Sequence, residues 1–384
     1  MIENIGKLVD ADEGLNHQIA DTFATVVESD YGWTEKVWAT LLRKDGTMSV
    51  SFGLGKYHNR NVMDCFAGVS RGSEQWTVRA ARRLDSDLGT TGAGPVQYSV
   101  LEPLQKVRFR LEKNETQKIA YDITFEGELP PFFEKRQRLR TGNRVGQDVI
   151  RYHQAGRLSG WVEVEGERFE VDENWFGFRD HSWGMRGHAV GMHAPDLQPN
   201  TGSPKNLRLL WGPTLMTRPD GSKYELMHFL INSDNWQYFS GHRNEAGGNS
   251  GEVKQAEFRQ MIPNLKFDPV TRQLKGGNYE ITMNDGEKIV QEITALGTSG
   301  FYLRTGLYGE WKGQRHGSWK GDYHEEGEYI PDITKILPEI GQLRDLPIAV
   351  KVGDDVGFGI QESIYSGIYP ELGLLEDSNF SSDL

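Results

Sequence analysis

The sequence predicts an all-β protein with two domains of antiparallel strands, each a barrel or a sandwich, and few short helices. Apolar and polar residues alternate over many short stretches, which is typical of half-buried strands. The 45 glycines among 384 residues and an aromatic content of 11% favour sheets joined by tight turns. Helical patterns do not alternate with the strands, which argues against a parallel βαβ fold. The expected architecture is therefore a pair of antiparallel barrels or sandwiches.

The best helix candidate at the front of the chain spans residues 1–30. Apolar side chains recur there at helical spacing: Ile19, Phe23, Val26 and Val27. The pattern stops at Tyr31 and Gly32.

A first block of strands follows. Apolar residues alternate over 37–41 and 48–52 around the turn Asp45–Gly46, which predicts a hairpin. Further strands are expected at 63–69, 75–81, 96–101, 107–112, 120–126, 149–154 and 158–164. A tight hairpin over 164–169 then leads into the stretch 172–186.

A second block follows a loop at 194–204 that contains three prolines. We therefore expect an N-terminal domain over residues 1–192 and a C-terminal domain over residues 193–384. Strands are expected at 207–217, 223–232, 236–243, 255–263, 265–269, 278–284 and 288–296. An aromatic block at 301–329 and a short helix within 331–343 complete the pattern.

Charge and cysteine content exclude several classes of function. The net charge of −12 argues against nucleic acid or an anionic membrane as a partner. A single cysteine, Cys65, rules out an intrachain disulfide and a Cys-rich zinc site. We find neither a signal peptide nor an apolar run of the ~20 residues that a membrane span needs. We expect a cytoplasmic protein, with a homodimer among the options for its oligomeric state.

The stretch 172–186 combines acidic, basic, imidazole and aromatic side chains, which is typical of a pocket wall. In a regular strand Arg179 and His181 share one face, and Asp180 and Ser182 share the other. The histidines are scattered without metal-ligand spacing, so we expect no metal and no organic cofactor. The absence of a GxSxG turn also argues against a serine hydrolase.

Acid–base chemistry fits these residues better. Candidates for proton transfer are Asp180, His181 and Glu173, with Glu310 and His316 in the second block. Tryptophans could shield a developing carbocation, although tryptophan is also common in the cores of β proteins: Trp175, Trp183, Trp211, Trp311 and Trp319.

The motif from Gly177 to Arg186, GFRDHSWGMR, resembles the Asp-His-x-Trp-Gly motif of the AttH/CrtC-like proteins, which include the carotenoid 1,2-hydratases. Supporting likenesses lie at 52–57, 94–95, 152–156 and 311–321. The resemblance covers most of the chain. It implies two lipocalin-like β-domains with a ligand cavity at or near their junction. It also implies lyase, hydratase or isomerase chemistry on apolar, terpenoid-like molecules.

In the hydratase-like members an aspartate near this motif is the expected proton donor. The resemblance assigns this role to Asp180, which is next to His181. We expect a hydratase, dehydratase or isomerase acting on a terpenoid, steroid or lipid. The alternatives are a carrier of apolar ligands and a pericyclase-like scaffold, with a glycosidase as a more remote option. The predicted catalytic residues are Asp180, His181, Arg179 and Glu173. The predicted substrate-binding residues are Trp175, Trp183, Arg186, Trp211, His228, Tyr302, Glu310 and Trp311.

Overall fold

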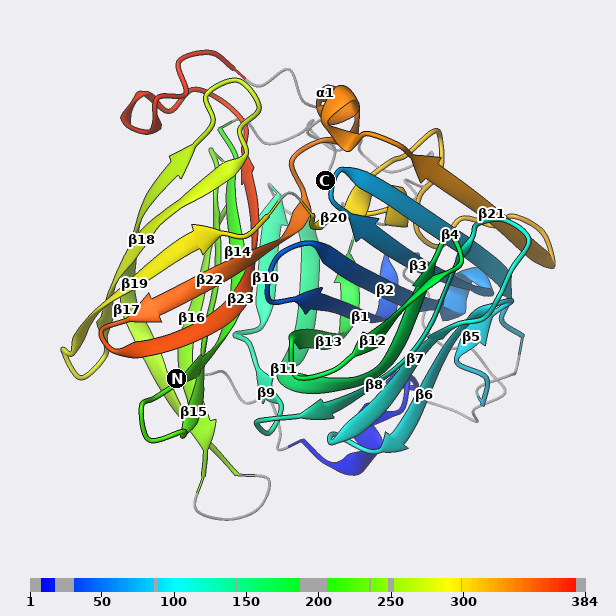
Figure 1. The fold of residues 1–384 in the computed structure, drawn as a ribbon, viewed down its shortest axis with the longest axis horizontal. Coiled ribbons are helices and arrows are strands. Elements are labelled where there is room, and N and C mark those ends of the chain that lie inside the picture. Colours follow the sequence, from blue (N-terminus) through cyan, green and yellow to red (C-terminus); the bar gives the residue numbers. More distant parts are fainter. Residues whose placement is uncertain are drawn as a thin grey trace.

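The structure of the chain is a computed structural model. It describes residues 8–17, 31–85, 89–141, 144–186, 206–234, 236–247, 252–297 and 299–377. Most of these residues form two antiparallel sheets, which Figure 1 shows side by side. The predicted all-β architecture of two lipocalin-like units is confirmed.

The first sheet is a half-barrel centred on β13 (Trp175–Arg186), which pairs with β1 on one side and β11 on the other. On the β1 side the order is β1 (Trp33–Arg43), β2 (Met48–Tyr57), β3 (Val62–Arg71), β4 (Glu74–Arg83) and β21 (Tyr323–Ile330). On the other side it is β11 (Arg144–Val164), β8 (Ile119–Gly127), β7 (Lys106–Leu111), β6 (Val96–Glu102) and β5 (Gly92–Ala93). Three short strands also pair with β11: β9 (Phe132–Phe133), β10 (Gln137–Thr141) and β12 (Glu167–Val171).

The second sheet closes into a barrel because its first strand, β19, pairs with β22. Its strands are, in spatial order, β19 (Lys288–Ala295), β18 (Leu274–Met283), β17 (Val253–Phe267), β16 (Gln237–Ala246), β15 (Lys223–Asn232), β14 (Arg208–Thr217), β23 (Asp355–Tyr365) and β22 (Arg344–Val352). The short β20 (Phe301–Tyr302) pairs with the start of β22. Although β21 comes late in the chain, it pairs with β4 of the first sheet (Figure 1). The division into domains at residue 192 stays a prediction.

Helices are few and short in the described part of the chain. The predicted helix over 1–30 lies largely outside the described residues, and residues 8–17 contain only the 3-10 turn η1 (Asp10–Glu13). The predicted helix within 331–343 is present as η4 (Ile333–Ile336) followed by α1 (Leu337–Ile340). The remaining helical segments are η2 (His58–Arg60), η3 (Leu303–Gly306) and η5 (Pro370–Leu372). Among the described helices, none has the length and apolar character needed to cross a bilayer.

The three largest apolar clusters of the described residues hold the two sheets together. One fills the half-barrel around Phe52, Phe109 and Phe125, and another fills the barrel around Tyr279 and Ile281. A third joins the two sheets, with Trp38, Phe176 and Phe178 of the first sheet against residues of the barrel such as Trp211 and Phe229. The outer face of β13 therefore lies in the junction between the two sheets.

Two strands each join segments that the sequence predicted as separate strands: β11 joins 149–154 and 158–164, and β17 joins 255–263 and part of 265–269. β11 continues through Ala155 and Gly156 because these residues pair with Phe178 and Gly177 of β13. β17 continues through Pro263 because β16 pairs with β17 only as far as Glu257. The missing N–H of Pro263 therefore breaks no ladder on that side.

Candidate functional site

The predicted motif folds as β13, and its side chains alternate between two faces of the sheet, as the sequence predicted for a regular strand. Arg179 and His181 lie on the inner face, within the half-barrel. Asp180 and Ser182 lie on the outer face, toward the barrel. The motif therefore contributes to two separate polar clusters.

On the inner face, the fully buried Arg179 forms an ion pair with Glu13 of η1. Its Nη1 and Nη2 donate to the two carboxylate oxygens at 2.8 and 3.0 Å, and its Nε and Nη2 donate to Gln154 Oε1 at 3.0 and 2.9 Å. Burial by itself would raise the pKa of Glu13, but the guanidinium outweighs it and holds that pKa at about 2. Arg179 is thus committed to protein partners and is poorly placed to position a substrate.

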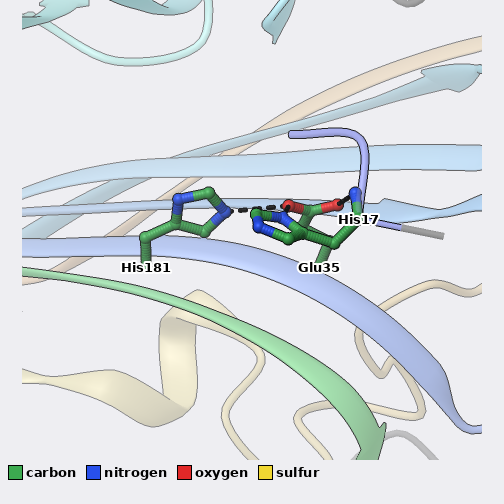
Figure 2. A group of neighbouring side chains, drawn as sticks. All are labelled: His17, Glu35 and His181. Atoms are coloured by element: carbon green, nitrogen blue, oxygen red, sulfur yellow. Dashed lines mark hydrogen bonds and ion pairs between the residues drawn. The ribbon is translucent and has the colours of Figure 1, made fainter. Parts of the chain in front are cut away.

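The imidazoles of His17 and His181 converge on the buried carboxylate of Glu35, as Figure 2 shows. His17 Nδ1 lies 2.6 Å and His181 Nε2 lies 2.9 Å from the same oxygen, Oε1. The second nitrogen of His181, Nδ1, lies 3.1 Å from Tyr152 Oη. Burial would raise the pKa of Glu35, but hydrogen bonds and positive charge from the two imidazoles in their protonated form hold it at about 2. Both nitrogens of His181 therefore face protein groups and not a substrate.

On the outer face a second cluster lies between the sheets. We call Lys36, Arg151, Asp180, Arg186 and Tyr308 the junction cluster. Asp180 Oδ2 lies 3.3 Å from Arg151 Nε, and Arg186 donates to Ser182 Oγ at 2.8 Å. Burial raises the pKa of Asp180, and the positive charges of Arg151 and Arg186 offset this only in part. The carboxyl is therefore easier to protonate than an ordinary aspartate.

The sequence did not single out Lys36, Arg151 or Tyr308 of the junction cluster, and Lys36 has the most unusual environment of the three. It lies on β1 opposite Ser182, and its Nζ sits 4.2 Å from the centre of the Tyr308 ring. Among the described residues no carboxylate is within ion-pair distance of this ammonium group. Burial, assisted by the charge of Arg186, lowers the pKa of Lys36 to about 7. A buried amine with this environment is a candidate proton acceptor.

The side chains of the junction cluster are largely buried, but some of them are partly exposed. Asp180 and Arg151 lie between two sheets, yet their side chains remain 13% and 15% exposed. Aromatic rings surround them: Trp38 meets Trp211 edge to face at 5.2 Å, and the Arg151 guanidinium lies 5.5 Å from the centre of the Phe229 ring. This is the kind of surrounding that an apolar molecule with a few polar groups would need.

Two further carboxyl groups border the junction cluster from the barrel. Asp345 is fully buried and accepts from Ser51 Oγ of the first sheet at 3.4 Å. Burial raises the pKa of Asp345 to about 7, and burial together with the charge of Asp345 also raises the pKa of Glu362. The two carboxyls hydrogen-bond to each other, so one proton between them removes their mutual repulsion.

The other predicted residues are scattered through the fold. Glu173 and Glu310 are exposed, and Glu310 pairs with Arg315 at 2.9 Å. Trp175 belongs to the core of the half-barrel, and Trp183 stacks on His17 with ring centres 3.7 Å apart.

The other predicted substrate-binding residues lie in different parts of the fold. His228 is buried inside the barrel against Tyr279. Tyr302 donates to Gln273 at 3.1 Å, and Trp311 donates to Glu328 at 2.7 Å. Of the predicted substrate-binding residues, Arg186 and Trp211 are the two that lie at the junction.

Sequence reasoning missed Lys36, Glu13, Glu35 and His17. Lys36 and Glu35 lie at the start of a strand whose alternation was recognised, and polar residues at such positions are usually solvated. Their burial depends on segments far away in the chain, such as that of Tyr308. The local sequence pattern around Glu35 and Lys36 does not indicate that distant segments bury them.

By sequence, residues 8–375 match the model of a family of unknown function (DUF8625), and the chain belongs to this family. A search of the curated proteins finds no similar sequence. Among solved structures, the chain is similar to an AttH candidate from Nitrosomonas europaea, with 15% identity and a TM-score of 0.51 over 86% of this chain and 92% of that one. The AttH-like fold expected from the sequence is thereby confirmed.

Two further structural similarities are weaker. Kievitone hydratase from Nectria haematococca has 11% identity and a TM-score of 0.40, over 92% of this chain and 95% of that one. CghA, in a structure with Sch210972, has 11% identity and a TM-score of 0.41, over 92% of this chain and 97% of that one.

Proposed function

We propose that this protein is an enzyme of the hydratase, dehydratase or isomerase type that moves protons on a hydrophobic small molecule, such as a terpenoid, steroid or lipid. The reaction takes place at the junction cluster. The observation that carries the proposal is a partly exposed carboxyl, Asp180, and a buried amine, Lys36, on one face of the sheet beside aromatic rings.

The register of β1 and β13 supports an acid–base pair. Asp180 lies opposite Trp38, and Lys36 lies opposite Ser182, so the two side chains are diagonal neighbours on the same face. The Cα atoms of such neighbours stand about 7–8 Å apart, and the reacting part of the substrate would contact both side chains. Asp180 then donates a proton to an alkene carbon or a leaving hydroxyl, and Lys36 accepts a proton from the attacking water or an adjacent carbon.

The remaining residues of the junction would position and shield the substrate. Arg186 offers its guanidinium to a polar substituent near Asp180. The rings of Trp38, Trp211 and Tyr308 would stabilise positive charge that develops on the carbon skeleton. His181 and Arg179 have no direct part in this scheme because they lie on the other face of β13.

The experiment is a screen for isotope uptake from the solvent. Apolar alkenes, alcohols and ketones are incubated with the protein in deuterated or oxygen-18 water, and mass spectrometry records mass gain. We expect uptake into one compound class with the wild type. Asp180→Asn and Lys36→Met should each lower its rate by ~100-fold or more. Asp220→Asn, at an exposed turn, is the matched control.

Two outcomes would overturn the proposal. Saturable binding of apolar compounds without any isotope uptake would show a carrier instead. Uptake that persists at full rate in both Asp180→Asn and Lys36→Met would show that the reaction takes place elsewhere.

A further inference from the structure

A separate cluster lies on the inner face of the half-barrel. We propose that His17, Glu35 and His181 form a binding site for one divalent transition-metal ion of the zinc class. One ligand atom from each residue lies within 4.8 Å of the others, and Glu35 and His181 are fully buried (Figure 2). The site is independent of the proposed reaction because it lies on the opposite face of β13 from Asp180.

The hydrogen bonds of Tyr152 determine which nitrogen of His181 carries the proton. Tyr152 Oη lies 2.8 Å from Glu13 Oε1 and 3.1 Å from His181 Nδ1. The Glu13 carboxylate only accepts hydrogen bonds, so the single phenol proton goes to it. The phenol oxygen must then accept from Nδ1–H of His181. In a neutral imidazole this leaves the lone pair of Nε2 directed at Glu35.

The same reasoning applies to His17. Its Nε2 lies 3.2 Å from Asp12 Oδ1, a carboxylate that accepts Nε2–H. In a neutral imidazole the lone pair of Nδ1 then points at Glu35 Oε1, 2.6 Å away. Two lone pairs thus converge on one carboxylate oxygen, which is repulsive unless positive charge lies between them.

Two protons or one dication can supply that charge. Two protons make both histidines cationic, in a place where Glu35 and His181 have no exposed surface. A divalent ion instead uses the lone pairs directly, and two imidazoles with one carboxylate are a known ligand set for zinc. The outer nitrogens are already held by Asp12 and Tyr152, as metal-bound histidines usually are.

The ion would connect three parts of the half-barrel. His17 belongs to the segment 8–17, whereas Glu35 is on β1 and His181 is on β13. A metal shared by the three would fasten that segment across two neighbouring strands of the half-barrel. Trp183, stacked on His17 at 3.7 Å, covers the ligand from one side.

The test is direct metal binding by the whole protein. After treatment with a chelator, the protein is titrated with Co²⁺ and then with Zn²⁺ near neutral pH. We expect one tightly bound Co²⁺ per chain, with the visible spectrum of a nitrogen- and oxygen-ligated ion, displaced by one Zn²⁺. A folded wild-type protein that takes up neither ion would overturn the proposal and leave the two-proton alternative.

Variants separate this site from adventitious binding. Glu35→Gln and His181→Ala should lose the Co²⁺ spectrum, and Tyr152→Phe should weaken binding by ~10–100-fold through loss of the outer hydrogen bond. His324→Ala is the matched control, because its imidazole lies 3.7 Å from the carboxylate of Glu326 at another place in the fold. Equal binding by Glu35→Gln and wild type would contradict the assignment. Isotope uptake at the junction cluster is a separate measurement, so either proposal can fail alone.

Discussion

The face of a strand on which a residue lies determines its ion-pair partners and its pKa in this protein. Arg179 and Asp180 are adjacent in sequence, yet one meets Glu13 inside the half-barrel and the other meets Arg151 at the junction. Burial favours the neutral form of each group, and the nearest opposite charge decides how far that preference is reversed. This explains why the pKa of Glu13 falls to about 2 while the pKa of Asp180 rises.

The ion pair of Glu13 and Arg179 gives a prediction for stability. Glu13→Gln should destabilise the fold by about 3–5 kcal/mol, because it leaves a fully buried guanidinium without its counter-charge. Glu170→Gln breaks the exposed pair with Arg168 and should cost less than about 1 kcal/mol. Urea unfolding of both variants measures the difference. Equal losses would mean that the inner pair is not buried as described.

The buried Asp345 gives a prediction for pH. Its pKa rises from 3.8 in a free side chain to about 7 in the fold, so the folded protein holds a proton that the unfolded chain releases. Its contribution to stability is complete below the lower value and is lost as the pH rises to the higher one. Asp345→Asn cannot ionise, so between pH ~5 and ~7 its stability relative to wild type should rise by up to ~1.4 kcal/mol per pH unit. Parallel pH profiles of unfolding free energy would contradict this.

At the scale of elements, β13 is positioned by its two neighbours and by glycine. Gly184 has φ +131°, and a Cβ there would lie 2.1 Å from the backbone oxygen of Asp148 on β11. The close approach of β11 to β13 at this point therefore requires glycine.

Replacing this glycine should be costly. We expect Gly184→Ala to lower the unfolding free energy by more than about 3 kcal/mol, from backbone strain and a clash with a backbone that cannot move aside. Gly166→Ala is the matched control, since Gly166 also has positive φ, +85°, but nothing lies within 4 Å of its Cβ position. It should cost only about 1–2 kcal/mol. Thermal melts that rank the two variants in the opposite order would refute this reason for the glycine.

Much of this element level could be predicted from the sequence, because a strand's alternation and the turns beside it are local. The hairpin of β1 and β2 and the two faces of β13 follow from such patterns. The long continuous β11 could not be predicted, because Ala155 and Gly156 look like a turn until their partners on β13 are known. The contacts of Glu13 with Arg179 and of His17 with Glu35 could not be predicted for a similar reason. Glu13 and His17 belong to a segment whose pattern predicted a helix.

For the whole molecule, the junction between the sheets is the feature that links stability to function. Trp38 of the first sheet and Trp211 of the barrel meet edge to face at 5.2 Å, and Trp211 also donates to Glu134 at 2.9 Å. The same aromatic contact that joins the sheets also borders the junction cluster.

A double-mutant cycle tests that contact. Trp38→Leu and Trp211→Leu should show a coupling energy of about 0.5–1.5 kcal/mol in urea unfolding, as expected for an aromatic pair in contact. Trp38→Leu combined with Trp161→Leu, whose indole lies beside Arg168, should show additive losses. Additivity in the first cycle as well would mean that the two sheets do not pack through these rings.

The most direct test of the site is photo-labelling with an apolar diazirine probe, followed by residue-level mass spectrometry. Our account predicts saturable labelling at Lys36, Trp38, Trp211 or Tyr308, reduced by an excess of any compound that takes up solvent isotope. Labelling confined to the interior of the barrel, around His228 and Tyr279, would contradict it.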